Sequence, residues 1–307
     1  MISKARLIYN PVSGHEQMPK NVATILDVLE RAGYEASAYR TTRKKKSAQN
    51  EATRAAKEGF DLIVAAGGDG TINEVVNGIA FLDKRPKMAI IPAGTTNDYA
   101  RALNIPRDNI AAAAKVILKN KIRKMDIGKA NFKVGDDQYF VNIAACGSLT
   151  ELTYGVPSEV KSALGYAAYL IKGAEMLPHL TENEMRLTYD GGVYEGKLSM
   201  FLLGMTNTIG GFEQIMPDAQ LSDGLFQLIV VKPSDPVKVL KLMALALNGN
   251  HMDDPDIIYT KTRTLKAELI GKSKGKKLPV NLDGELGDYC PVNFENLKQR
   301  IEFYVGG

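Results

Sequence analysis

The chain has 307 residues, enough for about two domains, with 45% hydrophobic residues, 24% charged residues and a formal net charge of +4. This composition excludes disordered, collagenous and coiled-coil classes, and the small charge excess is far from the footprint of a nucleic-acid-binding protein. Two cysteines, Cys146 and Cys290, are too few for a disulfide framework or a four-cysteine zinc site. We therefore expect buried, reduced thiols and a cytoplasmic protein.

Neither a leader nor a membrane-spanning segment is expected. Residues 1–6 run directly into a strand pattern, without the basic start and apolar stretch of a signal peptide. The longest apolar candidate, residues 237–247, is interrupted by Lys238 and Lys241. Contact with a membrane is therefore expected to be peripheral.

The first part of the chain alternates between strand and helix patterns. Strands are predicted at residues 5–9, 34–39, 61–66 and 87–91, and helices at 19–32, 47–58, 72–79, 97–103 and 109–118. The third strand is a nearly continuous apolar run, as in a strand buried on both faces. This order predicts a doubly wound parallel sheet whose ligands bind beyond the carboxyl ends of the strands.

From about residue 126 the pattern changes to two-residue alternation with hairpin turns. A hairpin is predicted at residues 132–141, strands at 185–189, 193–204, 225–231, 264–270 and 278–283, and inserted helices at 162–177 and 236–247. The last stretch, 294–305, is expected to be helical or mixed and to return to the first domain. The predicted fold class is α/β, with a doubly wound parallel-sheet domain (1–125 plus 291–307) and a mainly antiparallel β-sandwich domain (126–290).

The segment Gly67-Gly68-Asp69-Gly70-Thr71 follows the buried strand and opens a helix. Its glycines let the backbone approach a phosphate, and the helix N-terminus adds about half a positive charge, so the loop suits an anion. Thr71 and Glu74 also fit a capping box, with Thr71 as the N-cap. Asp69 beside a phosphate would need Mg²⁺ or a cationic partner to offset repulsion.

Two further turns follow predicted strands in the same way, at residues 10–14 and 92–98. Each alone could be an ordinary turn, but together the three loops predict a nucleotide triphosphate held by backbone amides and small hydroxyls. The chain has no Walker A motif, and no Gly-x-Gly-x-x-Gly opens its first helix. Ordinary P-loop and dinucleotide-binding folds are therefore disfavoured.

Five motifs occur in order along nearly the whole chain. They are Asn10-Pro11-x-Ser13-Gly14, Gly67-Gly68-Asp69-Gly70-Thr71-x-Asn73-Glu74, Gly94-Thr95-x-Asn97-Asp98-x-Ala100-Arg101, Pro217-Asp218-Ala219-x-Leu221-x-Asp223-Gly224 and Asp283-Gly284-Glu285. In this combination the sequence resembles the diacylglycerol kinase catalytic family, in particular the bacterial soluble diacylglycerol kinases. The second motif alone would not be specific, since NAD kinases and phosphofructokinases are similar there.

The resemblance implies a two-domain lipid kinase with ATP at an interdomain cleft and a lipid-substrate domain at residues 126–290. Such an enzyme would transfer the ATP γ-phosphate to the free hydroxyl of diacylglycerol, giving phosphatidic acid for phospholipid metabolism. It would bind Mg²⁺ and dock peripherally on an anionic membrane surface to reach its substrate. A homodimer is compatible with the same analogy.

The family's site residues carry over to positions of this chain. Its nucleotide contacts map to Asn10, Pro11, Val12, Ser13, Gly14, Thr41, Gly67, Gly68, Asp69, Gly70, Thr71, Ile72, Asn73 and Thr95. Its catalytic base maps to Glu285, its ion network near the phosphates to Asp69 and Asp98, and its Mg²⁺ loop to Gln220, Asp223 and Leu225. A lysine is usual after the Ser-Gly turn, whereas this chain has His15, whose imidazole would be mostly neutral at pH 7.

Several alternatives stay open on the residues alone. The Glu285 segment could be a solvated turn, the loop at 217–224 a self-capping Asx turn, and the basic runs at 43–46 and 272–277 either solvated loops or lipid-docking sites. The function could instead be phosphorylation of sphingosine, ceramide, undecaprenol or NAD. A non-catalytic, nucleotide-regulated lipid-binding protein is the alternative outside enzymes.

Overall fold

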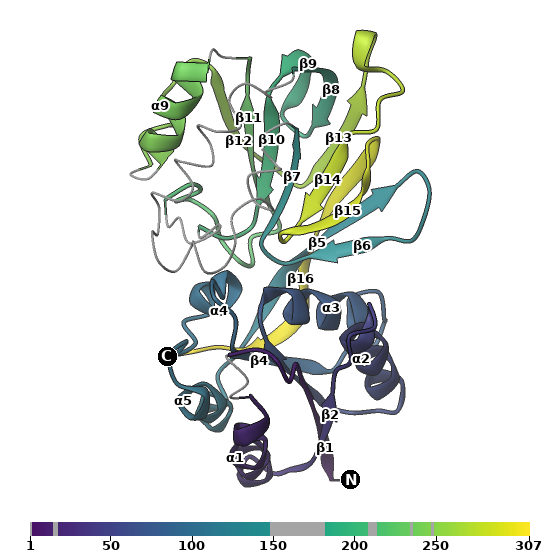
Figure 1. The fold of residues 1–307 in the computed structure, drawn as a ribbon, viewed down its shortest axis with the longest axis vertical. Coiled ribbons are helices and arrows are strands. Elements are labelled where there is room, and N and C mark those ends of the chain that lie inside the picture. Colours follow the sequence, from purple (N-terminus) through teal and green to yellow (C-terminus); the bar gives the residue numbers. More distant parts are fainter. Residues whose placement is uncertain (1, 15–17, 148–181, 208–213, 234–235, 247–248) are drawn as a thin grey trace. The chain divides into compact units, whose positions relative to one another are not determined.

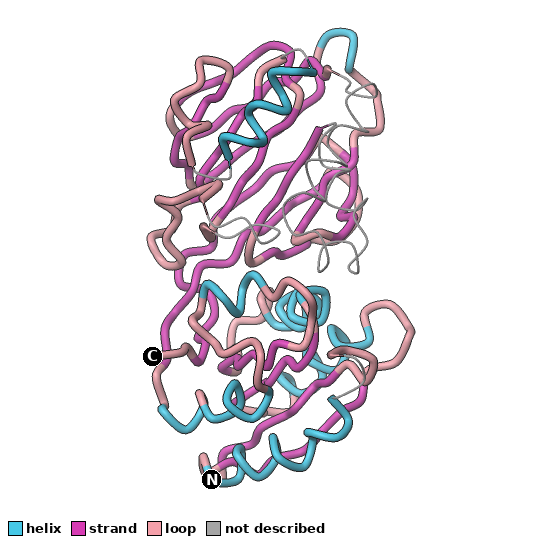
Figure 2. The backbone as a smooth tube through the Cα atoms, turned by 60° about the vertical axis from the view of Figure 1, so that its left-hand side comes forward, coloured by secondary structure: helices cyan, strands magenta, loops and turns pink. Residues whose placement is uncertain are grey.

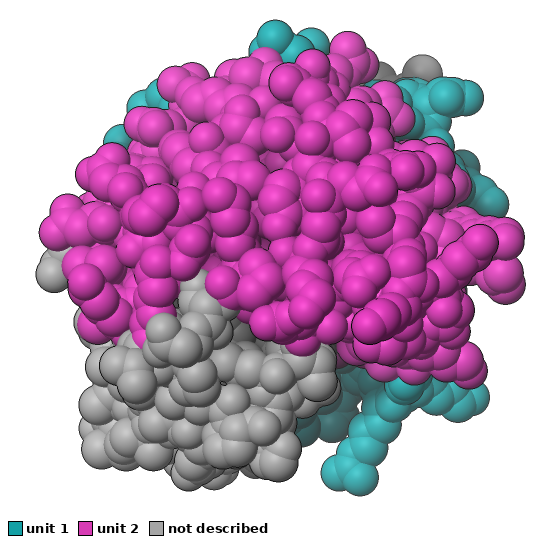
Figure 3. Space-filling view, turned by 90° about the horizontal axis from the view of Figure 1, so that it is seen from above, with its two compact units in different colours: residues 1–127, 298–307 teal, residues 128–297 magenta. Residues whose placement is uncertain are grey.

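The structure is a computed structural model that describes all residues except 1, 15–17, 148–181, 208–213, 234–235 and 247–248. The chain divides into two compact units: unit 1 comprises residues 1–127 and 298–307, and unit 2 comprises residues 128–297 (Figure 3). The sequence-based boundaries lie after residues 125 and 290. The helix expected at 162–177 lies outside the described residues. Among the described residues, no helix has the length and hydropathy needed to cross a bilayer.

Unit 1 is built on a parallel sheet whose first four strands lie in the order β2-β1-β3-β4 (Figure 1). Its strands are β1 (Ser3–Tyr9), β2 (Tyr34–Arg40), β3 (Leu62–Gly67) and β4 (Lys87–Pro92). Its helices are α1 (Met18–Arg31), α2 (Ser47–Lys57), α3 (Asp69–Ile79), α4 (Asp98–Ala102) and α5 (Ile110–Lys115), followed by the 3₁₀ turn η1 (Ile117–Lys119). Every residue of β3 is buried, as its apolar sequence predicts.

The strand order reverses direction between β1 and β3. From β1 the chain moves outward to β2, then crosses back to β3 and continues to β4. Because crossovers between parallel strands are right-handed, this reversal places α1 on one face of the sheet and α2 and α3 on the other. Accordingly α1 packs with α5, and α2 packs with α3 (Figure 2).

The C-terminal segment is a strand, so the expectation of a helical or mixed segment at 294–305 was wrong. β16 (Val292–Tyr304) pairs antiparallel with β13 through its first residues and parallel with β4 at Phe303. Buried Val292, Phe294 and Asn296 alternate with more exposed neighbours, which is the two-residue period of a strand. Pairing with both neighbours overrides the helix-favouring run at 297–300.

Unit 2 contains two antiparallel sheets. One has the order β12-β11-β10-β7-β14-β15, and the other contains β13, β8 and β9, with β5, β6 and the first half of β16. The elements are β5 (Ile122–Phe132), β6 (Gln138–Phe140), β7 (Ile143–Gly147), β8 (Asn183–Tyr189), β9 (Gly192–Leu198), β10 (Met200–Gly204), β11 (Phe226–Val231), α9 (Pro236–Ala246), β12 (Ile257–Thr262), β13 (Thr264–Leu269), η4 (Gly271–Ser273), β14 (Pro279–Leu282) and β15 (Glu285–Tyr289). β5 begins in unit 1 and ends in unit 2.

Aromatic side chains from both sheets fill the core of unit 2. The rings of Phe140 and Phe226 stack with centroids 5.7 Å apart, and Phe294 meets Phe140 and Phe201 edge-on at 6.1 Å. All four side chains are buried. Edge-on and offset pairs favour such cores beyond the gain from buried area alone. The predicted fold class, a parallel α/β domain followed by an antiparallel β-sandwich, is confirmed.

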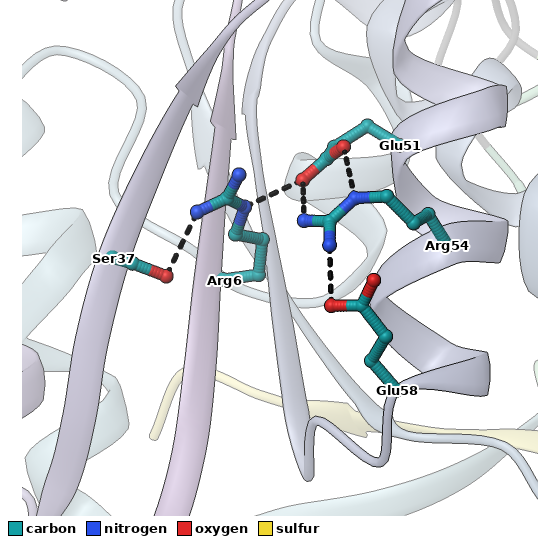
Figure 4. Close-up of polar contacts among 5 residues, drawn as sticks. All are labelled: Arg6, Ser37, Glu51, Arg54 and Glu58. Carbon is teal, nitrogen blue, oxygen red and sulfur yellow. Dashed lines mark hydrogen bonds and ion pairs between the residues drawn. The ribbon is translucent and has the colours of Figure 1, made fainter.

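A buried carboxylate joins β1 to α2 in unit 1 (Figure 4). Glu51 Oε1 lies 2.6 Å from Arg6 Nε and 2.7 Å from Arg54 Nη2, and Arg6 Nη1 donates to Ser37 Oγ at 2.9 Å. Burial of Glu51 opposes ionisation, but the hydrogen bonds from Arg54 and Arg6 outweigh it and lower the pKa of this carboxyl. The network therefore fixes α2 to the sheet while Glu51 stays charged.

Candidate active site

The loops after β1, β3 and β4 all begin at the carboxyl end of the unit 1 sheet. The loops after β1 and β3 flank the point where strand order reverses, which is where open α/β sheets bind ligands. Backbone bonds tie the strand ends together: Asn10 N donates to Ala66 O at 2.9 Å, and Ala93 N donates to Gly67 O at 2.8 Å. The structure therefore brings the three predicted loops together.

Two glycines allow the loops after β3 and β4 to touch. A Cβ on Gly94 would lie 2.7 Å from Gly68 Cα and 2.9 Å from Asn97 Oδ1, closer than side chains are tolerated. A Cβ on Gly68 would lie 3.4 Å from Gly94 Cα. The close backbone approach lies at the N-terminus of α3, where backbone N–H groups would stabilise a phosphate oxygen.

Asn97 organises the loop after β4. Its Oδ1 accepts a hydrogen bond from Gly94 N at 2.9 Å, and its Nδ2 donates to Gly94 O at 2.7 Å. Its own backbone N donates to Asp69 Oδ2 at 3.0 Å, which links this loop to the first turn of α3. Asn97 adopts a left-handed conformation (φ 51°), which Asn tolerates better than most residues. The motif that contains Asn97 does not by itself indicate this role.

The capping box predicted for α3 was wrong. The helix begins at Asp69 with Gly68 as its N-cap, and Thr71 lies inside its first turn. The carboxylate of Glu74 accepts from Lys46 N at 3.2 Å and Ala48 N at 2.8 Å, so it caps α2 instead. The local sequence fits a capping box, but the first turn of α2 has backbone N–H groups without helical partners, and these bind the Glu74 carboxylate.

The remaining nucleotide-contact candidates of unit 1 lie around the same strand ends. Gly14 is left-handed (φ 64°), and a Cβ there would lie 3.4 Å from Ala93 Cβ, so the loop after β1 reaches the end of β4. Thr41 N donates to Tyr9 O at 2.9 Å just after β2. Asp98 is buried in the first turn of α4, and Thr95 is exposed. His15 lies outside the described residues.

In unit 2, Asp283 and Gly284 form a two-residue turn between β14 and β15. Both have positive φ, 53° and 93°, and Leu282 pairs with Glu285 across the turn. An Asp-Gly pair with two left-handed residues is typical of a type I′ hairpin turn. Gly284 N donates to Asn281 Oδ1 at 2.9 Å, which closes the turn and places exposed Glu285 at the first position of β15.

Asp283 is a structural residue of this turn. Its Oδ1 accepts from Asn142 N at 2.8 Å and Ile143 N at 3.0 Å, and its Oδ2 accepts from Val141 N at 2.8 Å. Its own N donates to Ile143 O at 2.9 Å. Four hydrogen bonds to the segment entering β7 fix the turn, so Glu285 is presented from a rigid base. The Asp-Gly dipeptide signalled the turn, but nothing local signalled these partners.

The segment expected to form the Mg²⁺ loop is a self-capped turn. Asp223 Oδ1 accepts from Leu225 N at 2.9 Å, which is the Asx turn considered as the alternative. Gln220 is exposed and Asp223 is half-buried. The expected donor set of one carboxylate and two backbone carbonyls has the hard-oxygen chemistry that Mg²⁺ prefers, so these residues fit the ion. Within the described residues, no group of three His, Cys, Asp or Glu side chains gathers for a metal.

The cysteines are buried free thiols, as expected from their number. Cys146 Sγ and Cys290 Sγ lie 3.4 Å apart inside unit 2. Burial and the neighbouring Cys290 raise the pKa of the Cys146 thiol, so it stays protonated and unreactive. These residues belong to the core rather than to a site.

The fold thus combines a parallel α/β unit, which has glycine-rich loops at its strand ends, with a β-sandwich unit. The diacylglycerol kinase catalytic domain profile matches residues 4–130, and the YegS C-terminal NAD kinase beta sandwich-like domain profile matches residues 155–304. The chain is 47% identical to the diacylglycerol kinase of Bacillus subtilis (strain 168), covering 98% of this chain and 95% of the relative. Identity to the diacylglycerol kinase of Staphylococcus carnosus (strain TM300) is 45%, covering 99% and 96%.

Solved structures agree with these relatives. A crystal structure described as a diacylglycerol kinase from Bacillus anthracis str. Sterne matches with a TM-score of 0.76 at 27% identity, covering 99% of this chain and 97% of that one. The chain belongs to the diacylglycerol kinase family. It is an enzyme of that family, a lipid kinase with ATP as the family's phosphoryl donor, which excludes the non-catalytic lipid-binding alternative.

Proposed function

We propose that the protein transfers the γ-phosphate of ATP to the free hydroxyl of diacylglycerol and yields phosphatidic acid, with Glu285 as the general base. The observation that carries the proposal is the rigid Asp283-Gly284 turn, which presents an exposed carboxylate at the start of β15. The matching names and full-length coverage of the relatives support diacylglycerol as the acceptor.

Unit 1 would hold the nucleotide. The loops at 10–14, 67–73 and 94–98 supply peptide N–H groups and small hydroxyls at the carboxyl ends of adjacent strands, while the N-terminus of α3 supplies partial positive charge. This arrangement supports triphosphate binding without a Walker A lysine. Thr41 follows the neighbouring β2 and would complete the set.

Mg²⁺ would be held near the phosphates by Asp69 and Asp98, where it would neutralise charge on the β- and γ-phosphate oxygens. The hydrogen bond from Asn97 N restrains the Asp69 carboxylate. A second, structural ion would lie in the loop of Gln220, Asp223 and Leu225. The carboxylates at the first place, and the carboxylate and backbone carbonyls at the second, are oxygen donors that suit this ion.

Glu285 would accept the proton of the acceptor hydroxyl as the new O–P bond forms. The oxygen that attacks loses its proton to the carboxylate, and the γ-phosphoryl group leaves ADP with the bonding pair on the β-phosphate oxygen. Asp283 cannot take this role, because its carboxylate is occupied by three backbone N–H groups. Asp283 would therefore support the turn, and Glu285 would act as the base.

The direct test is Glu285→Gln, which keeps the size and polarity of the side chain but removes its basicity. We expect kcat to fall by at least about 100-fold, the usual contribution of a positioned base. The dissociation constant for ATP should stay within about twofold of wild type, measured by calorimetry, because the nucleotide loops belong to unit 1. Near-normal turnover by this variant would remove Glu285 from the mechanism.

A further inference from the structure

The loop between β13 and β14 carries four exposed lysines, Lys272, Lys274, Lys276 and Lys277. No acidic residue occurs from Gly271 to Pro279. Among the described residues, none of the four ammonium groups forms an ion pair. The loop backbone is nevertheless fixed, because Lys272 N donates to Glu184 Oε2 at 3.1 Å and Ser273 Oγ accepts from Glu184 N at 3.0 Å. The loop therefore exposes four positive charges on a backbone that hydrogen bonds hold in place.

Exposed apolar side chains lie beside this loop on β15, the edge strand of its sheet. Leu286 is 55% exposed and Tyr289 is 40% exposed. Leu286 pairs with Asn281 and Tyr289 pairs with Pro279, with an irregularity in register between the two pairs. Asn281 and Pro279 are two residues apart on β14, so their side chains lie on the same face of the sheet. Residues that pair across neighbouring strands share a face, so Leu286 and Tyr289 lie on that face as well. The extra residue on β15 explains why they are three positions apart rather than two.

The loop with the four lysines, strand β15 and the turn between β5 and β6 lie next to one another. Lys277 Nζ lies 5.9 Å from the centroid of the Tyr289 ring. A Cβ on Gly135, in the turn between β5 and β6, would lie 3.6 Å from Asp288 Oδ2 on β15. That turn also carries Val134, which is 76% exposed, and exposed Lys133.

We propose that this surface, which we call the docking face, binds an anionic membrane through the four loop lysines, Lys133, Val134, Leu286 and Tyr289. The inference rests on the proposed function, because it names where the lipid-bearing partner meets the enzyme. Aliphatic side chains and a tyrosine flanked by lysines match a bilayer interface, where apolar groups enter the headgroup boundary and ammonium groups meet lipid phosphates.

The charge balance favours a membrane over a second copy of the chain. The docking face has five lysines, and the same segments carry four carboxylates, Asp136, Asp137, Glu285 and Asp288, of which Asp137 is paired with Lys129. An isologous contact through the β15 edge would bring two such basic loops toward each other, which like-charge repulsion opposes. An anionic lipid surface, in contrast, complements the excess of positive charge.

The position of the docking face also suits the acceptor. Leu286 directly follows Glu285, so insertion of the Leu286 side chain into the headgroup boundary would bring the adjacent carboxylate to that depth. The free hydroxyl of diacylglycerol lies at the same boundary. The other basic run, residues 43–46, adjoins polar Thr42 and Ser47 and provides a charge-matched control.

Sedimentation with vesicles of phosphatidylglycerol and phosphatidylcholine tests the proposal. Changing Lys272, Lys274, Lys276 and Lys277 together to Gln should reduce vesicle binding at least about tenfold, and raised salt should weaken wild-type binding. Leu286→Ser should reduce binding about threefold or more. The matched variant with Gln at residues 43–46 removes four charges from unit 1 and should leave vesicle binding within about twofold of wild type. Thermal melting verifies that each variant is folded.

The readouts separate this inference from the proposed function. The lysine variant should lose activity on diacylglycerol in anionic vesicles but keep it in neutral detergent micelles. Unchanged vesicle binding by this variant, equal loss in the matched control, or a change of oligomeric state with loss of the lysines would overturn the docking face. Absence of phosphatidic acid with wild type in micelles would refute the proposed function instead, whatever the vesicle result.

Discussion

The two units present their candidate acids by different means. Asp69 of unit 1 stands in the first turn of α3 and accepts a hydrogen bond from Asn97, 28 residues later, across two adjacent loops. Glu285 of unit 2 stands beside a turn whose anchor, Asp283, binds amides 140 to 142 residues earlier in the chain. The first acid depends on a strand-loop-helix unit, and the second depends on distant strands.

This difference predicts how each site responds to a substitution. A strand-end loop is supported by the sheet and a helix N-terminus, so a single side chain contributes little unless it changes the backbone path. The hairpin turn of unit 2 is anchored to residues 141–143 by three bonds to one carboxylate, so a change at Asp283 should loosen that attachment. The following substitutions test that comparison, beginning with the largest expected effect.

Asp283→Ala should lower kcat about 10- to 100-fold and destabilise the protein by about 2 to 4 kcal/mol, because three backbone N–H groups lose their acceptor. The KM for ATP should not change. Urea unfolding and steady-state kinetics measure both effects. Asp288→Ala, in the same hairpin, is the control and should be nearly neutral; equal effects from the two variants would contradict an anchoring role for Asp283.

Gly94→Ala should weaken ATP binding at least about tenfold, or about 1.4 kcal/mol, because its Cβ would meet Gly68 Cα at 2.7 Å and separate the loops. Gly59→Ala is the control. Gly59 is left-handed (φ 81°) with open space around its missing Cβ, so alanine there should cost about 1 kcal/mol of stability and leave ATP affinity unchanged. Calorimetric titration with ATP distinguishes the two, and normal affinity in Gly94→Ala would show that the loops can separate harmlessly.

Removal of Mg²⁺ by a chelator should lower the melting temperature of wild type by about 5 °C if the loop at 220–225 holds an ion. Asp223→Asn keeps an oxygen acceptor for Leu225 N but removes the carboxylate charge. This variant should melt at the temperature of chelated wild type and should not respond to chelator. A full chelator response in Asp223→Asn would place the stabilising ion elsewhere.

Glu51→Gln should destabilise the protein by about 2 kcal/mol at neutral pH, because Arg6 and Arg54 lose a buried anion. The pKa of Glu51 is lowered in the fold, so its stabilisation is fully present above the ordinary carboxyl range. It disappears as the pH falls through the lowered pKa. Urea melts from pH 7 to pH 3 should therefore converge for the two proteins, whereas a constant difference would rule out ionisation as the source.

Glu58→Gln is the matched control for that prediction. Glu58 also pairs with Arg54 from α2, but its side chain is 52% exposed. Solvent screens such a pair, so the substitution should change stability by less than about 1 kcal/mol at any pH. The contrast isolates burial as the cause of the Glu51 effect.

Features with local patterns were predictable from sequence. The apolar run of β3, the glycines after it and the positions of α1 and α2 follow from periodicity and helix-stop signals. The resemblance to the family assigned roles to Glu285 and to the loop of Asp223. Composition and spacing alone were compatible with ordinary turns at both places. Their catalytic and metal-binding roles stay predictions.

Features that depend on distant partners were missed. The segment at 294–305 was expected to be helical or mixed, yet pairing with β13 and β4 makes it part of strand β16. Glu74 fits a local capping box, but its carboxylate binds the N-terminus of α2. The carboxylate of Asp283 binds backbone N–H groups 140 to 142 residues earlier in the chain. In each case a contact between segments far apart in sequence decided the outcome.

Transfer of label from [γ-³²P]ATP to lipid tests the account most directly. Purified protein would be incubated with Mg²⁺ and micelles containing diacylglycerol, sphingosine, ceramide or undecaprenol, with NAD as a water-soluble acceptor. The account predicts labelled phosphatidic acid from the diacylglycerol micelles and far less label in every other product. Labelling of another acceptor in preference to diacylglycerol, or no labelled product while ATP still binds, would contradict it.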